Sequence, residues 1–203
     1  TRLNALQKQF DELKEQAKVQ LDQVWQARRT VSATRRQFLQ QTLAENRFVR
    51  MQLIPYSRDA LMIERSLRDL LGAPDKFKDD IYTEAQDDTP AKGLIADLLL
   101  AADLSEKPGE PDTSVFEESI KQLQKRLTDA CRGAGGLGGW FNKYLAAEAE
   151  KRPELINHIL CWFPEDGLQV EYSRKGDGKD FQSIGQASAG QRAAAMLAFL
   201  LAH

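Results

Sequence analysis

The sequence has few of the residues that build metal sites, disulfide frameworks and catalytic pairs. Among 203 residues there are two cysteines, Cys131 and Cys161, and two histidines. The cysteine spacing fits neither a zinc site nor a disulfide framework, so we expect two buried, reduced thiols, as in a reducing cytosol. Neither His158 nor His203 lies near a nucleophile motif. We therefore predict no catalytic residue and no metal-binding residue in this chain.

A long hydrophobic run is also missing. The longest, residues 193–202, is too short to cross a bilayer, and no basic segment followed by an apolar one opens the chain. A content of 42% hydrophobic and 29% charged residues, with a net charge of -2, is typical of soluble globular proteins. These features predict a cytoplasmic protein without a membrane partner. The first residue, Thr1, is not a methionine, and the last residues keep a helical pattern, so we expect a piece of a longer protein.

No proline or glycine precedes Pro55, and the first forty residues carry a heptad pattern. This pattern predicts one long helix over residues 3–41, belonging to a coiled-coil domain at residues 1–46. Its narrow apolar stripe requires a partner, either an antiparallel helix that precedes Thr1 or a second copy of the chain. One heptad position is apolar throughout: Leu3, Phe10, Ala17, Val24, Val31 and Phe38.

Residues 47–203 predict a globular lobe, so the fold class is α+β, mainly α. Alternating apolar residues at positions 49, 51 and 53 indicate a strand that ends at Pro55. Helices are expected from a cap at Ser57 or Asp59 to Gly72, and over residues 91–104, 114–132, 142–150 and 153–162. The third begins with a capping box of Ser114 and Glu117, and the last has Pro153 at its first position. Residues 74–90 predict a loop or short helices, and residues 106–111 a linker.

A β-hairpin is expected near the end of the chain. One strand covers residues 168–172, the chain turns at residues 175–178, and it returns toward Phe181 and Ile184. The hairpin leads into a turn of small residues, 187–191, and then into a helix that begins at about Gln191. The free amides and the positive dipole end of such a helix favour a phosphate group. The alternative is an ordinary serine-capped helix that packs through its apolar residues.

The glycine-rich segment at residues 133–139 is the other candidate for phosphate binding. It follows a predicted helix rather than a strand, and it lacks the Lys-Ser or Lys-Thr ending of a phosphate loop. A flexible connector is therefore the preferred interpretation.

The small-residue turn, Ala187-Ser188-Ala189-Gly190-Gln191, resembles the LSGGQ signature motif of ABC-type ATPases. The helix after it is similar to the signature helix of the SMC-like branch, which includes DNA-repair and phage-defence ATPases. The order of coiled-coil helix, mixed lobe, hairpin and signature also resembles the C-terminal half of an SMC-like head. The motif resemblance covers residues 167–203. It departs from the common pattern at Ala187, where leucine is usual, and at Ala189, where glycine is usual.

This resemblance implies that the turn caps ATP held by an opposing head. Ser188 would then donate a hydrogen bond to the γ-phosphate and the Gly190 amide would approach it, with Ala189 beside them. Gln191 would lie near the ribose or the phosphate edge, and Arg192 would reach phosphate or pair with an acidic neighbour.

The chain contains neither a Walker A nor a Walker B motif. ATP and Mg²⁺ would therefore be bound mainly by parts outside this chain, which alone should not hydrolyse ATP. The implied partners are a second copy, joined through ATP-bridged heads and the coiled coil, and an effector subunit or domain.

Basic residues gather at the end of the predicted long helix. Between residues 23 and 50 there are six arginines and one acidic residue, Glu45. Heptad spacing places four of them in a stripe that should face outward beside the apolar seam, where they could contact DNA phosphates without reading sequence. A solvated face, or one that pairs with a partner, is the alternative. The stripe consists of Arg28, Arg29, Arg35 and Arg36.

Three functions remain open at this point. The first is a segment of an SMC-like ATPase that couples ATP binding and hydrolysis to DNA repair or antiviral defence. The second is a structural coiled-coil protein without a nucleotide role. The third is a nucleic-acid-binding module that acts through the arginine stripe alone.

Overall fold

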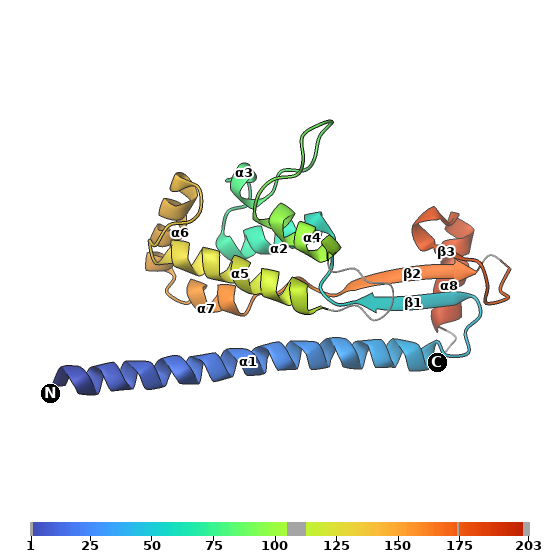
Figure 1. The fold of residues 1–203 in the computed structure, drawn as a ribbon. Coiled ribbons are helices and arrows are strands. Elements are labelled where there is room, and N and C mark those ends of the chain that lie inside the picture. Colours follow the sequence, from blue (N-terminus) through green and yellow to red (C-terminus); the bar gives the residue numbers. More distant parts are fainter. Residues whose placement is uncertain (1, 105–112, 174, 201–203) are drawn as a thin grey trace. The chain divides into compact units, whose positions relative to one another are not determined.

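The structure is a computed structural model that describes residues 2–104, 113–173 and 175–200 (Figure 1). The described residues form eight α-helices, one short 3₁₀ helix and a three-stranded antiparallel sheet. The predicted class, α+β and mainly α, is confirmed. The chain divides into two compact units: unit 1 is residues 1–55 and 166–203, and unit 2 is residues 56–165. This division differs from a boundary at residue 46, because α1 (Arg2–Thr42) contacts the first strand and belongs to the unit that contains it.

In unit 1, α1 spans 41 residues, as predicted from the absence of proline and glycine (Figure 1). Most of its heptad seam is exposed: Leu3 is 75% exposed, Phe10 61% and Phe38 51%, whereas Val24 is half-buried. Isolated helices gain little from propensity alone and are stabilised mainly by packing of an apolar face. The partner helix that the heptads predict therefore stays a prediction.

The sheet of unit 1 joins segments far apart in sequence. Strand β1 (Val49–Ile54) pairs antiparallel with β2 (Gly167–Ser173), which pairs with β3 (Phe181–Ser183). Both predicted strand regions are confirmed. One face packs against α8 (Ala189–Leu200), in a buried cluster of four residues: Val49, Tyr172, Ala187 and Ala195.

The opposite face of the sheet is polar. Arg50 lies opposite Glu171 in the register, and its Nε atom donates to the Glu171 carboxylate at 2.7 Å. The Arg50 guanidinium also lies 4.6 Å from the centre of the Phe181 ring. Arg50 thus contacts side chains of both other strands on the face away from α8.

Unit 2 is a helical lobe centred on α5 (Ser114–Cys131), which contacts α4 (Leu94–Leu104), α6 (Gly139–Lys151) and α7 (Leu155–Leu160). The remaining helices are α2 (Ala60–Leu71) and α3 (Lys78–Ile81). The buried core takes at least one residue from each of the six helices: Leu67, Ile81, Ile95, Ile120, Leu127, Phe141, Leu145 and Ile159.

Helix α2 has the ends that the sequence predicts. The Asp59 carboxylate accepts from the amides of Leu61 and Met62 at 3.0 and 3.1 Å, and Gly72 ends the helix with a left-handed φ of 68°.

One predicted helix cap and one predicted helix start are wrong. Thr113, not Ser114, is the N-cap of α5. The Glu117 carboxylate accepts from the Tyr56 hydroxyl at 3.1 Å and from that of Thr113 at 3.3 Å, so a tertiary contact replaces the predicted capping box. Pro153 lies before α7, in a turn, rather than at its first position.

Smaller differences concern the other boundaries. Helix α4 begins three residues later than predicted, and α6 begins three residues earlier, at Gly139. The segment over residues 74–90 contains α3, the isolated bridge between Gln86 and Thr89, and Thr83, which forms a second bridge with Lys92. The predicted linker at residues 106–111 lies outside the described residues.

Unit 2 is inserted between two neighbouring strands. The last residue of β1, Ile54, pairs with the first residue of β2, Gly167. Directly beyond this pair, the amide of Ser57 donates to the carbonyl oxygen of Glu165. The chain thus enters and leaves the helical lobe at adjacent points. Among the described helices, none is both long enough and apolar enough to cross a membrane.

Candidate functional site

The small-residue turn lies where the sheet passes into α8. After β3, a single 3₁₀ turn (Ile184–Gln186) leads to Ala187, which is buried against Val49 and Tyr172. The next three residues, 188–190, are exposed. Ala187 therefore anchors the turn to the core and presents the following residues to solvent. Helix α8 begins at Ala189, two residues earlier than predicted.

Ser188 and Gln191 form a reciprocal capping box at this helix start. The backbone amide of Gln191 donates to Ser188 Oγ at 3.3 Å, and the backbone amide of Ser188 donates to Gln191 Oε1 at 2.9 Å. The predicted alternative, a serine-capped helix, is thus present as a geometry. This cap leaves the hydroxyl hydrogen of Ser188 available, because a hydroxyl that accepts a hydrogen bond keeps its own hydrogen to donate.

The orientation of the Gln191 side chain is set from within unit 1. Its Oε1 atom accepts from the Ser188 amide and lies 3.4 Å from the Tyr172 hydroxyl, which donates to it. The Nε2 atom lies on the other side of the same side-chain amide and carries two hydrogens that it can donate. Sequence analysis missed Tyr172, because it is 19 residues away and reads only as a strand residue.

Gly190 is a glycine that the fold does not require. A Cβ atom added there would meet no heavy atom within 4 Å in the described chain, and its φ is not left-handed. Gly93 shows the contrast, since its φ is +99° and an added Cβ would lie 2.7 Å from the Ile81 carbonyl oxygen. Neither crowding nor backbone conformation explains the glycine at position 190.

The outward groups of the turn are hydrogen-bond donors. The first turn of α8 contains no acidic residue. Amides in the first turn of a helix have no partner within the helix, and the helix dipole adds partial positive charge there. Ser188 adds a hydroxyl, Gln191 an amide group, and Arg192 an exposed guanidinium. This arrangement suits an anion that accepts several hydrogen bonds.

The glycine-rich segment at residues 133–139 does not offer such a site. Gly133, Gly135 and Gly136 have φ values of 75°, 82° and 105°, which turn the chain from α5 toward α6. The Gly138 amide, at the start of α6, donates to the Asp80 carboxylate at 3.1 Å. A protein carboxylate therefore already occupies the place where a phosphate would bind.

The arginine stripe is only partly available to a nucleic acid. Arg28 does not face outward: its side chain is 14% exposed, and two of its nitrogens donate to the Asp166 carboxylate. Arg35 is 59% exposed and also contacts Asp166, at 3.3 Å. Arg29 is exposed and Arg36 half-buried. The expectation of four outward-facing arginines is therefore wrong for Arg28, because a buried carboxylate 138 residues away binds it.

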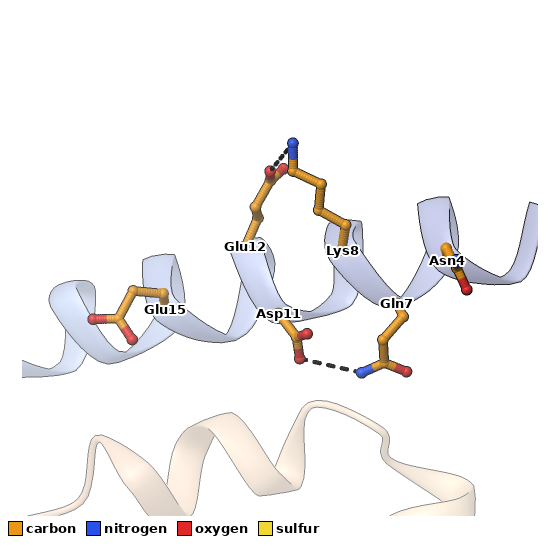
Figure 2. Close-up of a pocket in the computed structure, with 6 residues that line it drawn as sticks. All are labelled: Asn4, Gln7, Lys8, Asp11, Glu12 and Glu15. Carbon is orange, nitrogen blue, oxygen red and sulfur yellow. Dashed lines mark hydrogen bonds and ion pairs between the residues drawn. The ribbon is translucent and has the colours of Figure 1, made fainter. Parts of the chain in front are cut away.

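Another polar surface lies near the start of α1 (Figure 2). Figure 2 shows the Lys8–Glu12 ion pair at 3.7 Å and the hydrogen bond from Gln7 to Asp11 at 3.2 Å, both along one helix. All the lining side chains are exposed and come from α1 alone, so this shallow surface is a solvated helix face. The lining residues are Asn4, Gln7, Lys8, Asp11, Glu12 and Glu15.

Two groups of unit 2 have shifted pKa values. Burial raises the pKa of the Cys131 thiol, and a hydrogen bond from Lys151 lowers the pKa of Glu148. Both residues belong to unit 2, in α5 and α6. Among the described residues, no group of three or more histidine, cysteine or acidic side chains is arranged to hold a metal ion. No family model, curated protein or solved structure matches the chain.

Proposed function

We propose that this chain is the part of an SMC-like ABC-type ATPase that carries the signature turn, and that this turn caps ATP bound to an opposing head. The observation that carries the proposal is Gly190, exposed at the start of α8 and not required by the fold. A glycine at such a place leaves room for a ligand that approaches the backbone from outside the chain. The order of long helix, sheet, hairpin and signature helix supports the same assignment.

In this proposal the turn acts by donating hydrogen bonds. Ser188 donates its hydroxyl hydrogen to the γ-phosphate while its Oγ atom still caps the helix. The amides of Ala189 and Gly190 approach the same group, and Gln191 offers Nε2 to the ribose or the phosphate edge. Arg192, on the surface of α8, adds positive charge. ATP and Mg²⁺ are held mainly by a phosphate loop and acidic residues outside residues 1–203, in the intact protein or on another chain.

Closure of two heads on ATP would couple nucleotide binding to a DNA-directed activity, in repair or antiviral defence in the cytoplasm, through an effector subunit or domain. Direct DNA contact would not use Arg28, whose charge is balanced by Asp166.

A second function, a structural coiled-coil protein, is favoured by one observation. The heptad seam of α1 is exposed over most of its length, with Leu3 75% and Phe10 61% exposed, although Val24 is half-buried. In that function the chain would form a dimer that is indifferent to ATP. A charge in the seam, such as Phe10→Glu, would dissociate that dimer.

Ser188→Arg and Gly190→Glu test the nucleotide proposal in the intact protein that contains this chain. Ser188→Arg fills the γ-phosphate space with a bulky cation. Gly190→Glu places a negative charge in the first turn of α8, where it stabilises the helix but repels the triphosphate. We expect light scattering to show dimerisation of the wild type by a non-hydrolysable ATP analogue, and none for either variant.

Ser119→Arg is the matched control, because Ser119 is a half-buried serine of α5 whose hydroxyl donates to the Val115 carbonyl oxygen of the same helix, at 3.1 Å. It should dimerise like the wild type. If the analogue dimerises the Ser188 and Gly190 variants as well, the turn is only a helix cap. A dimer that forms without nucleotide and is lost in Phe10→Glu would then favour the coiled-coil function.

A further inference from the structure

A buried carboxylate connects α1 to the beginning of β2. Asp166, whose side chain is 3% exposed, lies immediately before β2. Arg28 of α1 binds it with both terminal nitrogens, Nη2 to Oδ1 at 2.5 Å and Nη1 to Oδ2 at 3.0 Å. Arg35 adds a third contact, from Nη1 to Oδ2 at 3.3 Å. All three residues belong to unit 1.

Ser32 completes this network between the two arginines. Its Oγ atom lies 3.1 Å from each carboxylate oxygen of Asp166 and accepts from Arg28 Nη1 at 2.6 Å. Ser32 is itself buried, at 5% exposure. A bidentate contact between an arginine and a carboxylate fixes both the distance and the angle between the two groups, which a single charge contact does not. The network therefore sets orientation as well as proximity.

The contacts come from one face of α1, and the heptad seam lies on another. Residues 28, 32 and 35 are spaced by four and three, so they share a face of the helix. The seam residues Val31 and Phe38, 44% and 51% exposed, lie on the neighbouring face, about 75° away around the axis on average, given 3.6 residues per turn. Holding one face against Asp166 thus leaves the seam uncovered.

We propose that Asp166 is a latch that fixes the rotational setting of α1 about its own axis relative to β2. The latch determines which way the heptad seam faces. It also connects α1 to the strand whose other end carries Tyr172, the residue that holds Gln191. This proposal does not rest on the nucleotide proposal, because every contact in it lies away from the small-residue turn.

Asp166→Asn tests the latch, because it keeps the shape of the side chain and removes its charge. Hydrogen exchange of the full chain, measured by mass spectrometry, should show at least tenfold faster exchange in peptides covering residues 25–39, while peptides from α5 stay unchanged. Glu171→Gln is the control: it breaks the Arg50–Glu171 pair of the same unit and should leave α1 unchanged. Unchanged exchange over residues 25–39 in Asp166→Asn would overturn the proposal.

Milder variants keep the test decisive if Asp166→Asn does not fold. Arg28→Lys keeps a positive charge but loses the bidentate contact with Asp166. We expect the exchange rate of the same peptides to rise about threefold or more. Arg35→Gln removes the more exposed of the two arginine contacts and should give a smaller rise in the exchange rate. Wild-type exchange rates in both variants would show that the network does not hold α1.

Discussion

At residue scale, the surroundings of each side chain decide what it contributes. Asp166 is buried and would be costly there without its two arginines. Ser188 is exposed and serves as a helix cap, with its hydroxyl hydrogen still available. Gly93 and Gly190 differ most clearly, because the backbone requires the first to be glycine and does not require the second.

Alanine substitutions should separate these two glycines. We expect Gly93→Ala to lower the free energy of unfolding by about 1–3 kcal/mol or more, because a left-handed φ and a 2.7 Å approach to Ile81 both oppose a Cβ atom. Gly190→Ala should leave stability unchanged or raise it by about 0.4–1 kcal/mol, since alanine restricts the unfolded chain. Denaturant unfolding measures both. A clear loss of stability in Gly190→Ala would mean that the fold does need this glycine.

The sequence allows residue roles to be predicted only where partners are near in sequence. The sequence predicts Gly72 as one end of α2 and Ser57 or Asp59 as the other, because capping is a local interaction, and Asp59 is the cap observed. Ser114 and Glu117 have the right spacing for a capping box, but Thr113 is the N-cap, and the Glu117 carboxylate accepts a hydrogen bond from the distant Tyr56 hydroxyl. The pairing of Arg28 with Asp166 leaves no local pattern at all, so the stripe was interpreted as facing outward.

At the scale of elements, α5 organises unit 2 through a buried polar contact as well as apolar packing. Gln124, 3% exposed, donates from Nε2 to the carbonyl oxygens of Leu160 and Trp162, at 3.1 and 2.8 Å. These carbonyls lie at the end of α7, where no further turn of helix can satisfy them. One side chain of α5 thereby ends a helix of six residues.

Replacing Gln124 should therefore destabilise unit 2 more than its apolar contacts suggest. In Gln124→Leu the volume is nearly kept but the two carbonyl groups lose their donor, and we expect a loss of about 1–3 kcal/mol in unfolding free energy. Gln122→Leu, an exposed glutamine of the same helix, is the control and should change stability by less than about 0.5 kcal/mol. Equal stabilities in urea unfolding would contradict a structural role for the Gln124 amide.

Element boundaries were predictable in proportion to element length and local signals. Helix α1 follows from forty residues of heptads without proline or glycine, and its predicted limits differ from the observed ones by one residue at each end. Helix α7 has only six residues and ends on a side chain from α5, so the sequence predicts that it exists but sets its limits two residues too wide at each end. In α8 the Ser188–Gln191 spacing of a capping box places the start at Ala189, whereas the glycine at position 190 suggested a later one.

At the scale of the whole molecule, the chain is a sheet-based unit with a helical unit inserted into it. The insertion could not be predicted, because the pairing of Ile54 with Gly167 depends on two strands separated by the entire lobe. A pattern of apolar residues predicts that each strand exists, but not which strand it pairs with.

The inserted unit should fold by itself. Residues 56–165 contain their own buried core, and the Ser57–Glu165 backbone hydrogen bond closes their ends. We expect this fragment to unfold cooperatively in urea, followed by circular dichroism. Thiol labelling gives a second measurement: exposed Cys161 should react in the folded fragment, whereas Cys131, whose pKa is raised by burial, should react only on unfolding. Rapid labelling of both thiols without denaturant would show that the fragment is not folded.

The adjacent ends of unit 2 also bear on the order in which the chain folds. Pairing β1 with β2 in an unfolded chain closes a loop of roughly 110 residues, which costs about 3–4 kcal/mol more entropy than a tight hairpin. Once the helices have packed and brought Ser57 next to Glu165, most of that loop is already closed. The helical lobe, built from contacts nearer in sequence, would then form first and template the sheet, so that the small-residue turn is among the last parts of the molecule to be completed.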